Sequence, residues 1–192
     1  MKTTKIALAL VASITAGVAL AHGGATGVVK ERMDGMAAMQ KAVKAVTPIM
    51  RGQAEYDANA VRSFAAAVEM HSGEAMTKLF PEGTGGKPSE AKAEVWSDWD
   101  GFETLAMDLK VLAKALAEAA DNGLATQSAG ASSGSMIGTG NMMGSGTMMG
   151  GNSAVGGMMD VNMLASMPAD MLFTRISQTC SACHTKYRLE SN

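Results

Sequence analysis

Two cysteines and a histidine near the C-terminus form the pattern that most directly predicts a chemistry. The run Cys180-Ser181-Ala182-Cys183-His184 matches C-x-x-C-H, the pattern of covalent haem attachment. On a helix the two thiols lie one turn apart on one face, where each can add to a haem vinyl group and form a thioether. His184 then offers an imidazole to the iron as the proximal axial ligand. The sequence therefore predicts one covalently bound haem c.

The C-x-x-C spacing also occurs in thiol oxidoreductases and in zinc sites. The oxidoreductase motif usually lies in a βαβ context, which this sequence lacks. A zinc site needs two further ligands, and the chain has no other cysteine and only His22 and His71 besides His184. Both alternatives are weaker than haem attachment.

The first 21 residues have the features of a secretory signal peptide. Lys2 and Lys5 give a positive start, residues 6–20 are mostly apolar, and Ala19-Leu20-Ala21 matches an A-x-A cleavage site. We expect cleavage after Ala21 and a periplasmic protein, because this haem attachment is made outside the cytoplasm. No other stretch approaches the ~20 apolar residues of a membrane span. With 18 acidic and 16 basic residues, the chain has no cationic excess that would predict nucleic-acid binding.

Composition and periodicity predict an all-α fold. Apolar residues make up 47% of the chain and aromatic residues only 4%, so the core must consist of Ala, Val, Leu and Met, which suits packed helices. Helical spacing of apolar residues occurs in four segments: about 28–50, ending or kinking near Pro48; about 57–72, with Asp57 as N-cap; 89–122, with Ser89 as N-cap and Asn122-Gly123 as its end; and Pro168 to near the end of the chain. Residues 22–192 should therefore form an antiparallel four-helix bundle.

A methionine- and glycine-rich insertion at about 127–166 separates the third and fourth predicted helices. It has no helical period. Nine of the 18 methionines lie in it or directly after it: Met136, Met142, Met143, Met148, Met149, Met158, Met159, Met163 and, just beyond its end, Met167. The simplest interpretation is a flexible loop. Alternatives are an oxidant sink, an adaptable surface for a partner, or a Cu(I) site built on the thioether pairs Met142–Met143, Met148–Met149 and Met158–Met159.

Several short motifs resemble one known family. The haem motif is followed by Thr185-Lys186-Tyr187-Arg188, the first predicted helix begins with Val29-Lys30-Glu31-Arg32-Met33-Asp34-Gly35-Met36, and the chain also contains the runs 52–57, 80–84 and Val95-Trp96-Ser97-Asp98. These motifs resemble the class II cytochromes c, meaning cytochrome c′ and its low-spin, Met-ligated relatives. The resemblance implies a haem held between helices, His184 as proximal ligand, and a homodimer. It also implies electron transfer with redox partner proteins or binding of small gases such as NO and CO. We expect no enzyme activity, because the sequence offers no distal acid–base pair for a reaction such as that of a peroxidase.

The resemblance places Met36 at the distal face of the haem. A thioether bound to the iron would give a six-coordinate, low-spin centre suited to electron transfer, whereas an unligated Met36 would form an apolar wall open to small gases. Met33 and Met39, one turn or less away, are secondary candidates for the haem pocket. Arg32 and Arg188, on opposite sides of the haem, could offset a propionate or remain solvated surface charges.

Two further residues stand out near this face. Gly35 lies in a helix interior, where glycine costs about 1 kcal/mol relative to alanine. It either permits close approach of the backbone to the porphyrin or is simply tolerated. His71 is expected to be a partly exposed helix residue.

Overall fold

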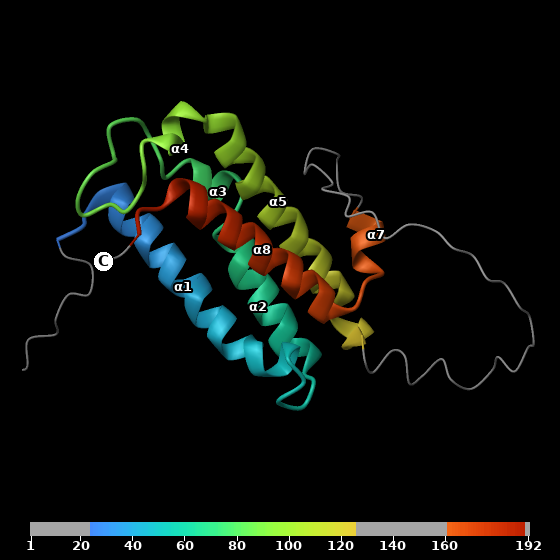
Figure 1. Cartoon of the computed structure of the whole chain (residues 1–192). Coiled ribbons are helices and arrows are strands. Elements are labelled where there is room, and N and C mark those ends of the chain that lie inside the picture. Colours follow the sequence, from blue (N-terminus) through green and yellow to red (C-terminus); the bar gives the residue numbers. More distant parts are fainter. Residues whose placement is uncertain (1–23, 126–160, 191–192) are drawn as a thin grey trace, which may run out of the picture.

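The computed structural model describes residues 24–125 and 161–190. Four long helices lie alongside one another in Figure 1: α1 (Gly27–Met50), α2 (Ala58–Met70), α5 (Trp99–Glu118) and α8 (Ala169–Tyr187). The shorter elements are α3 (Glu74–Thr77), α4 (Glu94–Ser97), the 3-10 helix η1 (Ala119–Asn122) and α7 (Val161–Ala165). The described residues contain no β-sheet, and one isolated antiparallel bridge joins Ala91 to Arg188. The predicted all-α bundle is confirmed. Residues 1–21, the predicted signal peptide, lie outside the described residues.

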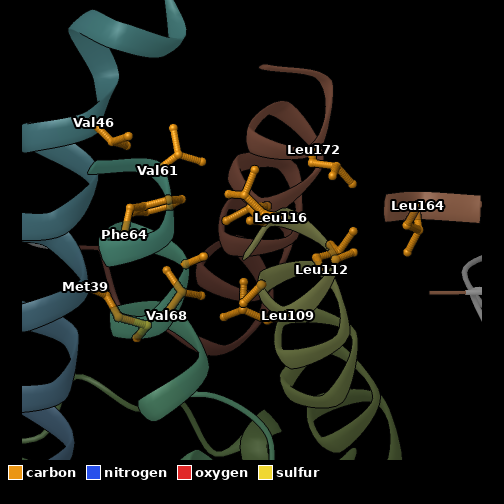
Figure 2. Close-up of a cluster of buried hydrophobic side chains, with 14 of the residues drawn as sticks. Met39, Val46, Val61, Phe64, Val68, Leu109, Leu112, Leu116, Leu164 and Leu172 are labelled. Atoms are coloured by element: carbon orange, nitrogen blue, oxygen red, sulfur yellow. The ribbon is translucent and has the colours of Figure 1, made fainter. Parts of the chain in front are cut away.

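The core lies between the four long helices. Figure 2 shows Val46 of α1 near Val61 of α2, and Leu116 of α5 beside Leu172 of α8. All four of these side chains are almost fully buried. Burial of each such side chain contributes ~1.5–3 kcal/mol through the hydrophobic effect, so these aliphatic stripes hold the bundle together. Within the described residues, no helix has the length and hydropathy to cross a membrane.

The ends of the first two helices follow the predictions. Pro48 lies in the last turn of α1, which ends two residues later. The carboxylate of Asp57 accepts hydrogen bonds from the backbone N–H groups of Asn59 and Ala60, so it caps α2 as expected.

The predicted start of the third helix is wrong. Ser89 is buried and does not cap a helix. Its hydroxyl accepts hydrogen bonds from Arg32 and from the backbone N–H of Ala91. Helical structure begins only with α4 and is interrupted at Asp98 before α5. The position of Ser89 in the sequence predicts a cap, whereas in the fold its hydroxyl accepts a hydrogen bond from the buried guanidinium of Arg32. The predicted end is correct, since η1 stops before Gly123, whose φ is 70°.

The chain on either side of residues 126–160 is held together. Asn122 donates hydrogen bonds of 2.8 Å to the carbonyls of Ala165 and Met167, and the N–H of Ala169 reaches the carbonyl of Gly123. Helix α7, which the sequence did not predict, packs on α5 and buries Leu164. Helix α8 begins at Ala169, one residue after Pro168, which serves as its N-cap.

Candidate haem-binding site

Helix α8 carries the C-x-x-C-H motif in its last two turns. Leu172, Ile176 and Tyr187 anchor the helix in the core. Cys180 and Cys183 are free thiols, half-buried at the edge of that core. His184 follows on the exposed side of the helix. The motif therefore presents two thiols against an apolar surface and an imidazole beside it, which is an arrangement that covalent attachment and axial ligation of one haem require.

Electrostatics at this motif favour haem attachment over a redox dithiol. Burial raises the pKa of Cys180, and burial together with the neighbouring Cys180 raises the pKa of Cys183 to about 11. Thiol oxidoreductases instead need a lowered pKa that gives a thiolate near neutral pH. Partial burial of the ring and the charge of Arg188 lower the pKa of His184, although Glu90 opposes this. The lowered pKa favours the neutral imidazole, which is the form that binds a metal.

The turn after His184 is pinned to the start of α5. The Tyr187 hydroxyl donates a hydrogen bond of 2.5 Å to Asp98 Oδ2, and the Tyr187 ring meets that of Phe102 edge to face at 5.5 Å. Lys186 forms an ion pair with the same carboxylate. A Cβ on Gly101 would lie 2.6 Å from the Tyr187 hydroxyl and 2.5 Å from Asp98 Oδ2, so only glycine fits there. These contacts fix the end of α8 and with it the height of His184.

The segment before α4 holds the same turn from another direction. Arg188 Nε donates to Glu90 Oε2 at 2.7 Å. The backbone N–H of Lys92 reaches the carbonyl of Tyr187 at 2.9 Å, and that of Leu189 reaches the carbonyl of Glu90 at 2.7 Å. Arg188 is thus half-exposed and paired with a carboxylate. Its predicted role toward a propionate stays a prediction.

Arg32 is buried, so the alternative of a solvated surface charge is wrong for this residue: only 6% of it is exposed. One terminal nitrogen donates to the carbonyl of Leu79 and the hydroxyl of Thr84. The other donates to the carbonyl of Thr84 and the hydroxyl of Ser89. The guanidinium also stacks on the Phe80 ring at 4.6 Å. Only the Nε–H is left for another acceptor, which leaves little capacity to bind a haem propionate.

These contacts set Met36 and His184 at the same height in the bundle. Arg32 bonds Ser89, and Ala91, two residues later, pairs with Arg188, so the first turns of α1 lie beside the end of α8 (Figure 1). Met36 follows Arg32 by one helical turn, and His184 precedes Arg188 by one turn. Because the two helices run antiparallel, both residues lie one turn in from the same end.

The seam between α1 and α8 is the loosest side of the bundle. The α1–α2, α2–α5 and α5–α8 pairs pack along their lengths, whereas α1 and α8 touch little. An open groove of about 420 Å³ follows this seam at the C-terminal end of α1, and it is lined by Met50, by the C-cap Arg51, and on α8 by Asp170, Phe173, Thr174, Ser177, Gln178 and Ser181. His184 continues the α8 stripe of Phe173, Ser177 and Ser181 at spacings of three and four residues. Of the residues that line the groove only Ser181 belongs to the motif, so it is the loose packing of α1 on α8 near the thiols and the imidazole that would leave room for a haem.

The other residues predicted near the distal face differ in their surroundings. Met39 is 8% exposed and points toward Val68 in the core, as Figure 2 shows. Met33 is half-buried. A Cβ on Gly35 would lie 3.1 Å from His71 Nδ1, so the close approach at this glycine is to the imidazole of a neighbouring helix end. His71 itself is half-buried at the C-cap of α2, in agreement with its expected partial exposure.

The proposed copper ligands Met142, Met143, Met148, Met149, Met158 and Met159 lie outside the described residues, as does Met136. Of the remaining two methionines of that group, Met163 is exposed and Met167 half-buried. Among residues 24–125 and 161–190, no group of three or more His, Cys, Asp or Glu side chains could hold a metal ion.

The sequence did not indicate that three residues position the site: Ser89, Glu90 and Asp98. Each acts through a partner distant in sequence, so no local pattern marks it. Asp98 carries the one available signal, because it ends the Val95–Asp98 run on which the family resemblance partly rests.

Comparison with known proteins agrees with this fold. Residues 27–138 match the family model described as cytochrome C′. The cytochrome c′ of Pararhodospirillum photometricum is 38% identical over 96 residues, which are 50% of this chain and 75% of that protein. The crystal structure of cytochrome c′ from Thermochromatium tepidum superposes with a TM-score of 0.55 at 24% identity, covering 85% of this chain and 95% of that one.

A second solved relative is cytochrome c′ from Alcaligenes xylosoxidans. A variant of it in complex with nitric oxide has a TM-score of 0.55 at 22% identity, covering 85% of this chain and 94% of that chain. A carbon monoxide-bound variant has the same TM-score at 23% identity and the same coverage of both chains. The comparisons define the class as the four-helix-bundle cytochromes. The chain belongs to the cytochrome c′ family, and this membership implies a covalently bound haem c.

Proposed function

We propose that Cys180 and Cys183 attach one haem c and that His184 binds its iron from the proximal side. The observation that carries this proposal is the position of the motif: two half-buried thiols at the core edge and an exposed imidazole on the stripe that lines the loosest seam of the bundle. When bound, the haem supplies an iron centre that changes oxidation state and has one further coordination position. With the haem attached in this way, α1 would lie beside that position.

Binding of a small gas at the distal face is the function that this geometry supports best. Met36 lies at the height of His184 and packs against the hydrophobic core, so its side chain can act as an apolar wall. Such a wall excludes charged and large ligands but admits neutral diatomic gases. The relatives from Alcaligenes xylosoxidans, which have NO or CO bound, support the same proposal.

Electron transfer is the second candidate function. The thioether of Met36 lies at the height of His184 in the bundle, and this position favours electron transfer. A sulfur ligand there would give a six-coordinate iron whose geometry changes little between oxidation states. In that case redox partner proteins, and not gases, would be the physiological partners.

Absorbance spectra of the purified haem-loaded protein distinguish the two functions. Gas binding predicts a high-spin ferric spectrum at neutral pH and ready uptake of CO by the ferrous form. It also predicts that Met36→Leu, which keeps the apolar volume, leaves the ferric spectrum high-spin. A low-spin ferric spectrum that becomes high-spin in Met36→Leu, but not in the control Met33→Leu, would establish Met36 as a ligand and electron transfer as the function.

We also propose that the protein works in the periplasm as a homodimer. The signal-like residues 1–21 and the typical location of cytochrome c′ proteins support the compartment. Cell fractionation, with N-terminal sequencing of the exported chain, tests the compartment. We expect the exported chain to begin at His22. Sedimentation equilibrium of the haem-loaded chain tests the homodimer, and a monomer at micromolar concentration would contradict it.

A further inference from the structure

A small aromatic pocket lies apart from the α1–α8 seam. Its volume is about 210 Å³, and it is lined by Phe80, Glu82, Trp96 and Trp99. These residues come from the loop after α3, from α4 and from the first turn of α5. None of them lines the seam groove. The pocket brings both tryptophans of the chain to one place beside a carboxylate.

The aromatic walls of this pocket are held rigidly. Trp96 Nε1 donates a hydrogen bond of 2.9 Å to the carbonyl of Phe80, and a Cβ on Gly85 would lie only 3.0 Å from the Trp96 ring. The rings of Trp99 and Phe80 both pack on Phe102, at centroid distances of 5.6 Å and 4.8 Å. A ligand therefore meets walls that are already in place, which reduces the entropy lost on binding.

The one charged residue in the lining of the pocket is acidic. Glu82 belongs to the lining, is exposed, and forms no ion pair among the described residues. Asp100 follows Trp99 and is also exposed. One cation lies nearby, because the guanidinium of Arg32 stacks on the Phe80 ring. It does not line the pocket, and its two terminal nitrogens are already shared among four oxygen acceptors.

We propose that this pocket binds the head group of a small quaternary ammonium compound. A quaternary ammonium has no N–H groups, so it needs no hydrogen-bond acceptor and is stabilised by the faces of aromatic rings and by a nearby carboxylate. Trp96 and Trp99 supply the rings, because the Phe80 ring already carries the Arg32 guanidinium, and Glu82 supplies the carboxylate. The volume is below the ~300–1,000 Å³ of pockets that enclose drug-sized molecules, which restricts the occupant to a compact group. The proposal does not depend on the ligand state of the haem.

Ligand-observed NMR titration of the full haem-loaded chain tests this proposal with two isosteric probes. Choline carries the positive charge, whereas 3,3-dimethylbutan-1-ol has the same shape without it. We expect choline to bind with a millimolar dissociation constant and the neutral alcohol to bind at least tenfold more weakly. Equal affinity for the two probes would show a merely apolar pocket and would overturn the proposal, as would the absence of choline binding.

Two variants locate the binding and a third controls for general charge. Glu82→Gln lies on an exposed loop and should weaken choline binding at least threefold. Trp99→Leu should reduce it at least tenfold, with an unchanged haem spectrum as evidence that the bundle is intact. Glu94→Gln removes an exposed carboxylate that does not line the pocket and should change the affinity less than twofold. Equal weakening by Glu82→Gln and Glu94→Gln would contradict a specific site.

Discussion

Arg32 donates a hydrogen bond of 2.5 Å to the hydroxyl of Ser89 and so joins the first helix to the loop before α4. The same hydroxyl accepts a hydrogen bond from the backbone N–H of Ala91. Residue Ala91 in turn forms an antiparallel bridge with Arg188, the C-cap of α8. The loop before α4 thus lies between the predicted distal helix and the turn that follows His184. These contacts therefore help to set the spacing between α1 and α8, and a haem bound between the two helices would depend on that spacing.

Replacing Arg32 should both destabilise the bundle and disturb the haem site. Arg32→Met leaves Thr84 and Ser89 without their charged donor, and we expect the free energy of unfolding to fall by roughly 3 kcal/mol. Urea unfolding of the haem-loaded protein measures this change. Lys44→Met, on an exposed position of the same helix, should change it by less than about 0.5 kcal/mol. A similar small loss in both variants would show that the buried contacts of Arg32 contribute nothing.

Substitution of Gly101 should loosen the turn after His184. In Gly101→Ala the new methyl would overlap Asp98 Oδ2 and the Tyr187 hydroxyl. We expect a loss of about 1–3 kcal/mol in the free energy of unfolding from overpacking, although alanine alone would favour a helix. Thr104→Ala, exposed on the same helix, is the control and should be close to neutral. If Gly101→Ala is more stable than the wild type, the close contact does not exist.

The contact between Gly35 and His71 can be tested by a double-mutant cycle. In the wild-type background, Gly35→Ala places a methyl 3.1 Å from His71 Nδ1, which offsets the helix preference of alanine. In a His71→Ala background the methyl is accommodated, so Gly35→Ala should stabilise by up to about 1 kcal/mol. Thermal unfolding of the four proteins gives the coupling. Identical effects of Gly35→Ala in both backgrounds would mean that another neighbour, such as the porphyrin, limits this position.

Asp108 should make the protein less stable at neutral pH than at mildly acidic pH. One carboxylate oxygen of Asp108 is buried and has no hydrogen-bond partner among the residues that the structure describes, and burial raises the pKa of this carboxyl. A carboxyl whose pKa is higher in the folded than in the unfolded chain costs stability above the folded pKa, and the cost disappears as the pH falls below the unfolded value of about 3.9. Asp108→Asn should therefore stabilise the protein at pH 7, by up to about 1 kcal/mol, and have little effect near pH 4.

Urea unfolding of the two proteins at pH 7 and pH 4 measures this difference. Asp100→Asn, on an exposed position of the same helix, should show no comparable change between the two pH values. A stabilisation by Asp108→Asn that is equal at both pH values would contradict a role for ionisation of the buried carboxyl.

Deletion of residues 136–159 should leave the haem site intact. The described chain on both sides is tied together by Asn122, which bonds the carbonyls of Ala165 and Met167. We expect unchanged oxidised and reduced absorbance spectra and an unfolding free energy within about 0.5 kcal/mol of the wild type. A shifted spectrum would show that the insertion reaches the haem. Titration of Cu(I) into the wild type and the deletion variant tests the copper hypothesis. Equal, weak uptake of Cu(I) by the two proteins would contradict it.

The sequence alone was sufficient to predict the all-α bundle and the candidate haem motif. Both depend on local patterns: helical spacing of apolar residues identifies a buried face, and C-x-x-C-H needs only one helical turn to bring its groups together. The same locality accounts for the correct cap at Asp57, whose carboxylate bonds N–H groups two and three residues away.

Only the tertiary structure decided which side chains meet across the bundle. Ser89 resembles a helix cap in sequence, yet its hydroxyl meets a guanidinium 57 residues away. Gly35 lies against His71, and the tryptophans of α4 and α5 meet a loop carboxylate in one pocket. The packing of helices brings such partners together. Each contact depends on the relative placement of two separate elements, so the periodicity within either element cannot predict it.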